Sequence, residues 1–375
     1  MIISKVNIVR FTLNFIRPFV TSFGEIKQRE TILVQVFDKQ TNEFGWGEAP
    51  VLSLSLYNPE IPSTVEAIIR EVLFPILKNK TISHPREIRA LFRPIKGNTF
   101  AKSALETACY DLFGKLNAKP TYILLGGKKK QLLLSDTISL HEEVQDCVSE
   151  AQQYIDQGIH YLKLKTKPGK DIEYVKVLRE TFPKVHIMVD ANSSYVYNHE
   201  TVEIFKELDK YDLYTIEQPL GSDDIVDHAK LQKELITKIG LDESIESEHD
   251  AEKAIELGSC KLVNIKIPRV GGLTEAMAIN VLCKKSKIST WVGGMLESPI
   301  GFYANVALST LDNFDLPIDF LGALSYVVGY KDNFNNFPLD IHNGSADVIL
   351  DKPGLGLDLH WDVVEKNITH SITLS

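Results

Sequence analysis

Short apolar segments that each end in a charged residue recur at a regular interval between residues 162 and 297. The charged residues are Lys165, Asp190, Glu217, Asp242 and Lys266, and 24 to 27 residues separate each from the next. One strand, one helix and two short loops fill such an interval. Apolar strands that alternate with helices are typical of a parallel sheet covered on both faces. The pattern therefore predicts β/α units whose charged residues lie at the carboxyl ends of the strands.

Three further segments extend this interval to eight units. The segment around Ser139 lies 26 residues before Lys165, and those at Gly293 and Asp319 follow Lys266 after 27 and a further 26 residues. Eight units of one period predict an α/β fold in which a (β/α) TIM-type barrel closes, rather than an open sheet. We expect this catalytic barrel domain to span residues 126–330.

Residues 1–125 follow a different pattern and predict a separate α+β domain. Alternating apolar and polar residues within 2–48 predict three antiparallel strands. Helical periodicity then predicts helices over the ranges 62–78, 85–92 and 98–116. The loop-rich tail, residues 331–375, is expected to pack on this N-terminal domain.

Two segments of the N-terminal domain are irregular and unusually apolar. We expect a loop over residues 17–29, with Gly24 at its tip, and a second irregular segment over 51–60. Such segments either cover a core or form a lid that selects ligands, and the residues alone leave both interpretations open.

Bulk properties exclude several classes of function. The chain has 375 residues, of which 44% are hydrophobic and 24% charged, as in ordinary globular proteins. Its net charge of −9 argues against nucleic-acid binding, which needs a basic face. The four cysteines form no CxxC motif, and neither a signal peptide nor an apolar segment of membrane-spanning length is present. We therefore expect a cytoplasmic protein with reduced cysteines and no membrane partner.

Three consecutive strands end in a carboxylate, namely Asp190, Glu217 and Asp242. In a barrel these groups converge, and each pair of like charges repels by about 4 kcal/mol at an effective dielectric constant near 20. A positive charge must compensate them. Ligation by oxygen alone favours Mg²⁺, or Mn²⁺, over zinc. The pattern therefore predicts a magnesium site.

Lysines lie on both sides of these carboxylates. Lys163 and Lys165 are two residues apart and project to the same side of one strand, while Lys266 ends a strand across the barrel. A partly desolvated lysine beside a cation has a lowered pKa and can act as a general base. With a metal holding a substrate carboxylate, such a lysine can remove the α-proton to give a stabilised enediolate. Each charge could instead only pair with a neighbour, but five at this spacing favour the catalytic interpretation.

The same segments resemble the enolase superfamily. The motifs that carry the resemblance are KLK at 163–165, VDAN at 189–192, IEQP at 216–219, LDES at 241–244 and NIKIPRVGG at 264–272. Lysine at 266 is similar to the muconate cycloisomerase subgroup. Arg269 and GGMLES at 293–298 resemble the branch that holds o-succinylbenzoate synthases and N-succinyl or N-acyl amino acid racemases.

The resemblance implies a role for each matching residue. Asp190, Glu217 and Asp242 would bind Mg²⁺, Lys165 would be the general acid/base, and Lys266 would act on the opposite face. Lys163 would support Lys165 and contact a small-molecule carboxylate substrate. The segments 17–29 and 51–60 would be specificity loops. The further substrate contacts implied are Asn192, Arg269, Gly293, Met295, Glu297, Phe19, Phe23 and Tyr57.

The resemblance implies dehydration of 2-succinyl-6-hydroxy-2,4-cyclohexadiene-1-carboxylate on the route to menaquinone. Racemisation of N-succinyl or N-acyl amino acids is the main alternative, alone or as a second activity of the same site. Dipeptide epimerisation, cycloisomerisation and a barrel that only binds carboxylates are further alternatives. The chain departs from the branch at Pro299, where we expect glycine, near Phe302, where we expect a basic or polar residue, and along DFLGAL at 319–324. These departures affect which substrate the protein binds, not the proton-transfer chemistry. The family resemblance also implies a homo-oligomer.

Overall fold

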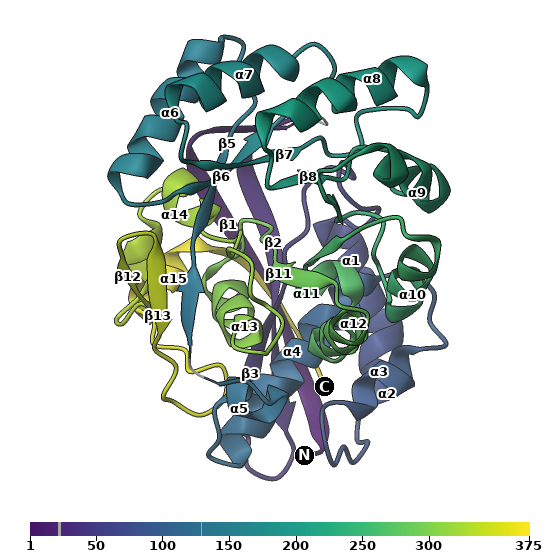
Figure 1. The fold of residues 1–375 in the computed structure, drawn as a ribbon. Helices are drawn as coiled ribbons and strands as arrows, with labels where there is room; N and C mark the ends of the chain where they lie inside the picture. Colours follow the sequence, from purple (N-terminus) through teal and green to yellow (C-terminus); the bar gives the residue numbers. More distant parts are fainter. Residues whose placement is uncertain (22–23, 129) are drawn as a thin grey trace.

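The computed structural model of the protein describes residues 1–21, 24–128 and 130–375. A parallel sheet that curls into a barrel forms one part, and a long antiparallel sheet with its own helices lies beside it (Figure 1). The predicted fold class, a modified (β/α) barrel with an α+β capping domain, is confirmed.

Seven parallel strands form the barrel sheet, in the order β11-β10-β9-β8-β7-β6-β5. Their bounds are β5 Ser135–Ile138, β6 Tyr161–Lys165, β7 His186–Asp190, β8 Thr215–Glu217, β9 Ile239–Leu241, β10 Leu262–Ile265 and β11 Ser289–Val292. The helices between and after them are α6 Val144–Asp156, α7 Ile172–Thr181, α8 His199–Leu208, α9 Ile225–Glu234, α10 Glu248–Leu257, α11 Ile267–Val270, α12 Leu273–Lys285, α13 Pro299–Ser309 and α14 Gly322–Tyr326. In Figure 1 the longer helices lie outside the sheet. The predicted strand–helix alternation is therefore present.

Alternate residues of the barrel strands face opposite sides of the sheet. In β6, Leu162 and Leu164 are buried on the side of Ile138, whereas Lys163 and Lys165 project to the other side. Lys165 is the register partner of Asp190 on the next strand. Polar residues thus gather on the inner face, and apolar residues pack outward under the helices.

The eighth barrel position differs from the predicted strand. Ile318 forms a parallel bridge with Leu134, and Asp319 forms one with Gly293, so this segment joins the two ends of the sheet without a regular strand. Pro317 has no N–H to donate, and α14 begins three residues after Asp319, which leaves no room for a longer strand. Two bridges nevertheless close the barrel.

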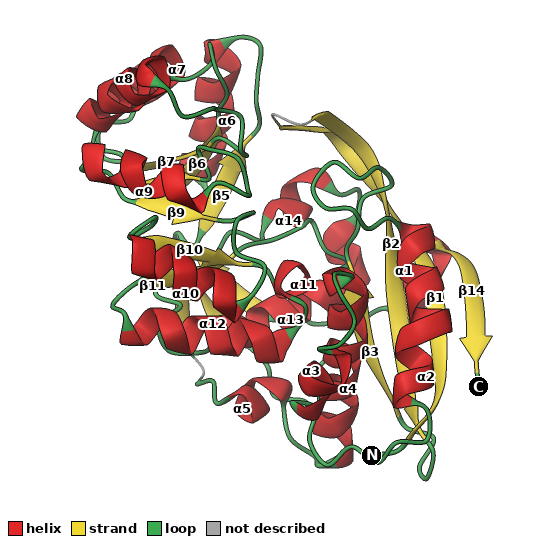
Figure 2. Cartoon of the chain, turned by 90° about the vertical axis from the view of Figure 1, so that its right-hand side faces the viewer, coloured by secondary structure: helices red, strands yellow, loops and turns green. Residues whose placement is uncertain are grey.

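The capping domain contains a four-stranded antiparallel sheet in the order β14-β1-β2-β3. Its strands are β1 Ile3–Thr21, β2 Gly24–Asp38, β3 Phe44–Ala49 and β14 Ile368–Leu374, and its helices are α1 Pro62–Ile68, α2 Phe74–Leu77, α3 Glu87–Phe92, α4 Thr99–Leu116 and α5 Thr121–Leu125. Figure 2 shows α3 and α4 between this sheet and the barrel. Gly45 and Gly47 allow β3 to pack closely on α4, because a Cβ at either position would lie 2.0 Å from a carbonyl oxygen of α4.

The predicted helix 62–78 is interrupted. A π-helical segment, Ile69–Leu73, separates α1 from α2. Pro75 cannot donate the helical hydrogen bond to the preceding turn, and a wider turn accommodates this missing bond.

The predicted loop at 17–29 is largely a β-hairpin, so this expectation was wrong. Strand β1 continues to Thr21 and β2 begins at Gly24, with Phe19 paired to Ile26. The register shifts between Asn14 and Phe19, and the hairpin arms therefore bend away from the rest of the sheet. Residues 51–60, by contrast, contain no regular element, as expected.

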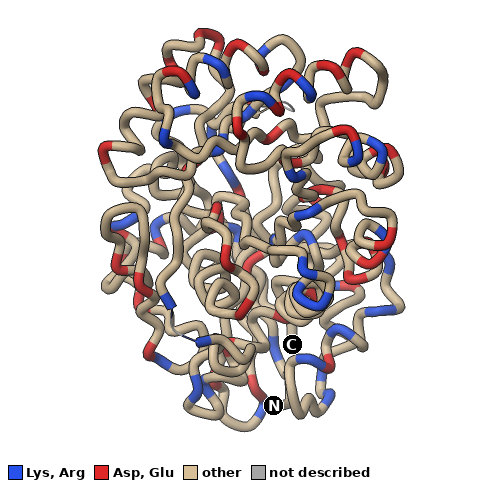
Figure 3. The backbone as a smooth tube through the Cα atoms, viewed as in Figure 1, with Lys and Arg blue, Asp and Glu red and all other residues tan. Residues whose placement is uncertain are grey.

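The C-terminal residues form a smaller sheet, then return to the cap. Strands β12 Leu339–His342 and β13 Ser345–Val348 pair with β4 Gln131–Leu133, and α15 Trp361–Val364 precedes β14. Figure 3 shows lysine and arginine interspersed with acidic residues along the backbone. In the described part of the chain, no helix is both long and apolar enough to cross a membrane.

Candidate active site

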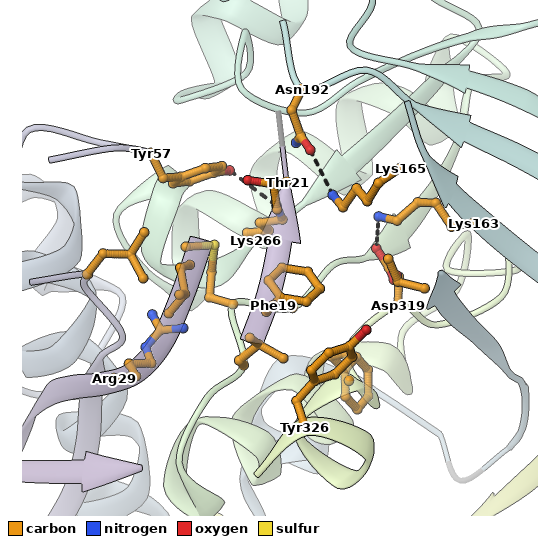
Figure 4. A pocket seen from close by; sticks show the side chains of 18 residues that line it. Phe19, Thr21, Arg29, Tyr57, Lys163, Lys165, Asn192, Lys266, Asp319 and Tyr326 are labelled. Atoms are coloured by element: carbon orange, nitrogen blue, oxygen red, sulfur yellow. Dashed lines mark hydrogen bonds and ion pairs between the residues drawn. The ribbon is translucent and has the colours of Figure 1, made fainter. Parts of the chain in front are cut away.

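A pocket lies at the carboxyl ends of the barrel strands, with a volume of about 710 Å³ when the solvent space at its open mouth is included (Figure 4). The barrel contributes Thr137, Lys163, Lys165, Asn192, Lys266, Gly294, Met295, Leu296, Asp319, Phe320, Gly322 and Tyr326. The cap contributes Phe19, Thr21, Ile26, Arg29, Leu52 and Tyr57. The β1–β2 hairpin and the 51–60 segment therefore form part of the pocket wall, which favours the specificity interpretation of both segments.

Three lysines reach this pocket from two sides of the barrel. Lys163 and Lys165 lie on β6, and Lys266 follows β10, with three strands between β6 and β10 in the sheet. Their exposed fractions are 4%, 8% and 6%, respectively. Because the barrel curls back on itself, β6 and β10 present these amines from opposite sides.

The three predicted metal-binding carboxylates lie on the same inner face. Asp190 and Glu217 are register partners on β7 and β8. Glu217 is paired with Gly240, and Asp242 is two residues further along and so faces the same side. All three are buried.

Each of these carboxylates contacts a cation of the chain. Lys165 Nζ lies 2.6 Å from Asp190, and Lys163 Nζ lies 3.1 Å from Glu217 and 3.5 Å from Asp190. Lys266 Nζ lies 2.7 Å from Asp242. The positive charge that three buried carboxylates require is supplied here by lysines.

The described residues contain no group of three or more acidic, histidine or cysteine side chains arranged to hold a metal ion. Each of the three predicted ligands, Asp190, Glu217 and Asp242, instead forms an ion pair with a lysine. The chemistry of the donor set still fits a magnesium ion, because three buried carboxylates at neighbouring strand ends are hard oxygen ligands.

The electrostatic environment separates the pKa values of the carboxylates. Burial opposes ionisation of Asp190, but Lys165 and Lys163 outweigh it and lower the pKa of Asp190 to about 2. Burial, followed by the charge of Asp190, raises the pKa of Glu217. Asp190 is therefore the stronger acid of this pair.

The pKa values of Lys163 and Lys266 shift upward, opposite to the direction expected for a lysine beside a divalent cation. Burial alone would lower the pKa of Lys163, but the surrounding carboxylates, Asp319 first, raise it above the usual value. Burial also opposes the charge of Lys266, whereas Tyr57 and nearby carboxylates raise its pKa. The chain's own charges thus keep both amines protonated.

The predicted substrate contacts separate into two groups. Lining the pocket are Lys163, Asn192, Met295, Phe19 and Tyr57. Arg269, Gly293 and Glu297 do not line it, and Phe23 lies outside the described residues. Asn192 accepts a hydrogen bond from Lys165 at 2.9 Å and donates one to Glu243 at 3.0 Å.

Arg269 lies behind the carboxylates and supports them. Its guanidinium forms an ion pair with Asp242 and donates a hydrogen bond to the Tyr57 hydroxyl at 3.1 Å. Tyr57 in turn donates to Asp242 at 3.1 Å. Arg269 therefore connects a strand-end carboxylate to the cap, rather than lining the pocket.

Three residues near the site were not predicted as site residues. Asp319 forms an ion pair with Lys163, and Asn264 donates a hydrogen bond to Glu217 at 2.7 Å. Asn264 precedes Lys266 by two residues, so the alternation that placed Lys163 beside Lys165 could have identified it. Arg29 ends the segment 17–29 that was predicted as a specificity loop, but nothing in the sequence distinguishes it from the other residues of that segment.

Two of the three departures from the expected branch, Pro299 and Phe302, lie in the packing of α13. Pro299 is buried at the start of this helix, where its missing N–H needs no partner. Phe302 is buried and packs edge-on to Phe320 at 5.3 Å between ring centroids. Phe320 lines the pocket, so Phe302 contacts a residue of the pocket wall without lining the pocket itself.

Comparison with known proteins agrees with this architecture. Residues 4–126 match the mandelate racemase/muconate lactonizing enzyme N-terminal domain, and residues 146–363 match the enolase C-terminal domain-like family. The chain is 41% identical to the o-succinylbenzoate synthase of Geobacillus kaustophilus over 93% of this chain and 91% of that protein.

Two further relatives cover nearly the whole chain. The N-succinylamino acid racemase of Thermus thermophilus is 34% identical over 95% of this chain and 94% of its own length. A crystal structure of an enolase superfamily member from Listeria innocua superposes with a TM-score of 0.93 at 36% identity, covering 100% of this chain and 99% of that one. The chain therefore belongs to the mandelate racemase/muconate lactonizing enzyme family of the enolase superfamily.

Proposed function

We propose that this protein is an o-succinylbenzoate synthase, which dehydrates 2-succinyl-6-hydroxy-2,4-cyclohexadiene-1-carboxylate in menaquinone biosynthesis. The observation that carries the proposal is the pair of buried lysines, Lys165 and Lys266, which line one pocket from opposite sides of the barrel. Identity of 41% to a named synthase over nearly the full chain supports the choice of substrate.

Asp190, Glu217 and Asp242 would hold Mg²⁺. When bound, Mg²⁺ supplies a Lewis acid that makes a proton next to a carboxylate more acidic, as in enolase superfamily sites generally. Lys165 and Lys266 form ion pairs with two of these residues, Asp190 and Asp242.

The chain's own residues then handle the proton. Lys165 Nζ removes the α-proton of the ring carboxylate and returns it to the departing hydroxyl group as water forms. Lys266 stays protonated and stabilises the negative charge that develops on the substrate. Asn192 orients Lys165 through the 2.9 Å hydrogen bond between them.

The proposal is tested by measuring the rate of dehydration by wild-type protein, Lys165→Ala and Lys176→Ala. Lys176 is exposed on α7 and serves as the matched control. We expect Lys165→Ala to lose at least about a hundredfold in kcat, and Lys176→Ala to behave as wild type. EDTA should abolish wild-type turnover, and added Mg²⁺ should restore it. Full activity in Lys165→Ala would contradict the proposal.

Racemisation of N-succinylamino acids is the second candidate. A dehydration needs one proton-transferring base, whereas the pocket has a buried lysine on each of two opposite sides. In D₂O, each lysine would exchange the α-proton of one enantiomer. We expect Lys165→Ala to lose α-proton exchange mainly with one enantiomer, and Lys266→Ala to lose it mainly with the other. Absence of exchange with either enantiomer in wild-type protein would exclude this activity.

A further inference from the structure

Arg29 is a buried cation in the wall of the proposed active-site pocket. It lies on β2 of the cap, its exposed fraction is 2%, and it contributes to the lining. Figure 4 shows Arg29 on the side of the pocket away from Lys163 and Asp319. A charged group at this depth normally has a hydrogen-bonded counter-ion, because desolvation of an unpaired charge is costly.

Among the described residues, Arg29 has no such counter-ion. Its Nε and Nη2 atoms are buried without a hydrogen-bond partner in the part of the chain that the structure describes. The other cations of the pocket differ, since Lys163, Lys165 and Lys266 each form an ion pair with a carboxylate. Burial lowers the pKa of Arg29, which is the direction expected for a charge that lacks compensation.

The two acidic residues whose charges act on Arg29, Glu48 and Glu297, are engaged elsewhere or are weak acids. Glu48 accepts hydrogen bonds from Thr31, at 3.0 Å, and from the Ser298 hydroxyl, at 2.6 Å, as well as from two backbone N–H groups. Burial, followed by Glu48, raises the pKa of Glu297 to about 7, so it is only partly ionised at neutral pH. Neither acid forms an ion pair with Arg29 in the described residues.

The substrate class of the proposed function contains an anion of the required kind. A succinyl group ends in a carboxylate, and this carboxylate takes no part in the proton transfers at Lys165 and Lys266. The wall of the same pocket also includes apolar side chains, among them Phe19, Ile26, Leu52 and Met295. Such a wall suits the methylene groups that separate the two ends of the substrate.

We propose that Arg29 binds the terminal carboxylate of the succinyl group and thereby selects succinylated substrates. The inference rests on the proposed function for the identity of the substrate class. A guanidinium offers two parallel N–H groups to one carboxylate, so two donors that lack partners suit this ligand. Arg29 is a binding residue, and it takes no part in the proton transfer.

The test compares ligands that differ only at the terminal carboxylate, with Mg²⁺ present throughout. One pair is o-succinylbenzoate and 2-butanoylbenzoate, and the other is N-succinyl and N-butanoyl phenylalanine. Dissociation constants are measured calorimetrically for wild-type protein, Arg29→Met and Arg29→Lys. Methionine removes the charge but keeps an unbranched apolar side chain, and lysine keeps the charge without the paired donors.

We expect wild-type protein to bind the succinyl ligand of a pair more tightly than the butanoyl ligand by roughly 10- to 100-fold. Arg29→Met should lose this preference because its affinity for the succinyl ligand alone falls. Arg29→Lys should keep part of the preference. If Arg29→Met binds both ligands more weakly by the same factor and has a lowered melting temperature, Arg29 has a structural role and the proposal is overturned. An unchanged preference in Arg29→Met would overturn it as well.

Failure of the proposed function would look different. It would appear as absent dehydration by wild-type protein, whereas the role of Arg29 is judged from binding alone. The amino acid pair keeps the binding test independent of the ring substrate. Absence of any succinyl preference in wild-type protein, for both pairs, would refute the role of Arg29 whatever the turnover.

Discussion

Replacing Glu297 by glutamine should stabilise the folded protein at alkaline pH and leave the pocket intact. Glu297 is 2% exposed, and its Oε1 accepts a hydrogen bond from the Met295 N–H at 2.8 Å. Its Oε2 has no hydrogen-bond partner within the described chain. Glutamine keeps the Oε1 contact with Met295, which lines the pocket, and removes the buried charge.

The expected magnitude follows from the pKa of Glu297. Burial, followed by the charge of Glu48, raises this pKa from 4.5 to about 7 in the folded protein. The folded state therefore binds more protons than the unfolded state between these values, and stability is lost as the pH rises through them. The full effect above pH 7 is about 3 kcal/mol. The glutamine variant should gain about 2–3 kcal/mol over wild type between pH 5 and pH 8.

Urea unfolding of wild type and Glu297→Gln at the two pH values measures this gain. Glu203→Gln, which changes an exposed residue of α8, is the control and should show a gain near zero. The same stability difference at both pH values would refute the reasoning. It would mean that Glu297 is ionised and stabilised as an anion, and Arg29 would then be its natural partner.

Two glycines of the barrel give further predictions. Gly240→Ala should cost about 1–3 kcal/mol in urea unfolding, because the new Cβ would lie 2.8 Å from the Trp291 ring; a neutral result would show that this ring can move. Gly293→Ala would place a Cβ 2.1 Å from Asn264 Oδ1 and so displace the donor to Glu217. We expect its activity to require more Mg²⁺ than that of wild type, and an unchanged Mg²⁺ titration would show that Asn264 does not position Glu217.

The inner face of the barrel could be predicted from sequence because a strand has a period of two residues. Lys163 and Lys165 share one side for this reason, and register then places Asp190 beside Lys165. The regular interval predicted which strands would be neighbours. It could not predict that the eighth segment would shorten to two bridges, since this depends on Pro317 and on the start of α14.

The cap was predicted less well, because its contacts join distant segments. The hairpin arms around Phe19 pack against Tyr326, with 5.0 Å between ring centroids, and no local pattern near residue 19 indicates this contact. Arg29 is a similar case. Its lack of a partner depends on which donors already occupy Glu48. Two of these donors, Thr31 on a strand and Ser298 at a helix start, are far apart in the sequence.

The edge strand β14 also constrains how the chain can fold during synthesis. Residues 368–374 pair with β1, so that Val6 lies opposite Leu374. Until β14 has been synthesised, the edge of β1 that will pair with it has unpaired N–H and C=O groups. Such an edge can pair with strands of other chains and so lead to aggregation. The capping sheet is therefore completed after the barrel strands have emerged. Deletion of β14 should lower the yield of folded protein more than it lowers the activity of the molecules that do fold.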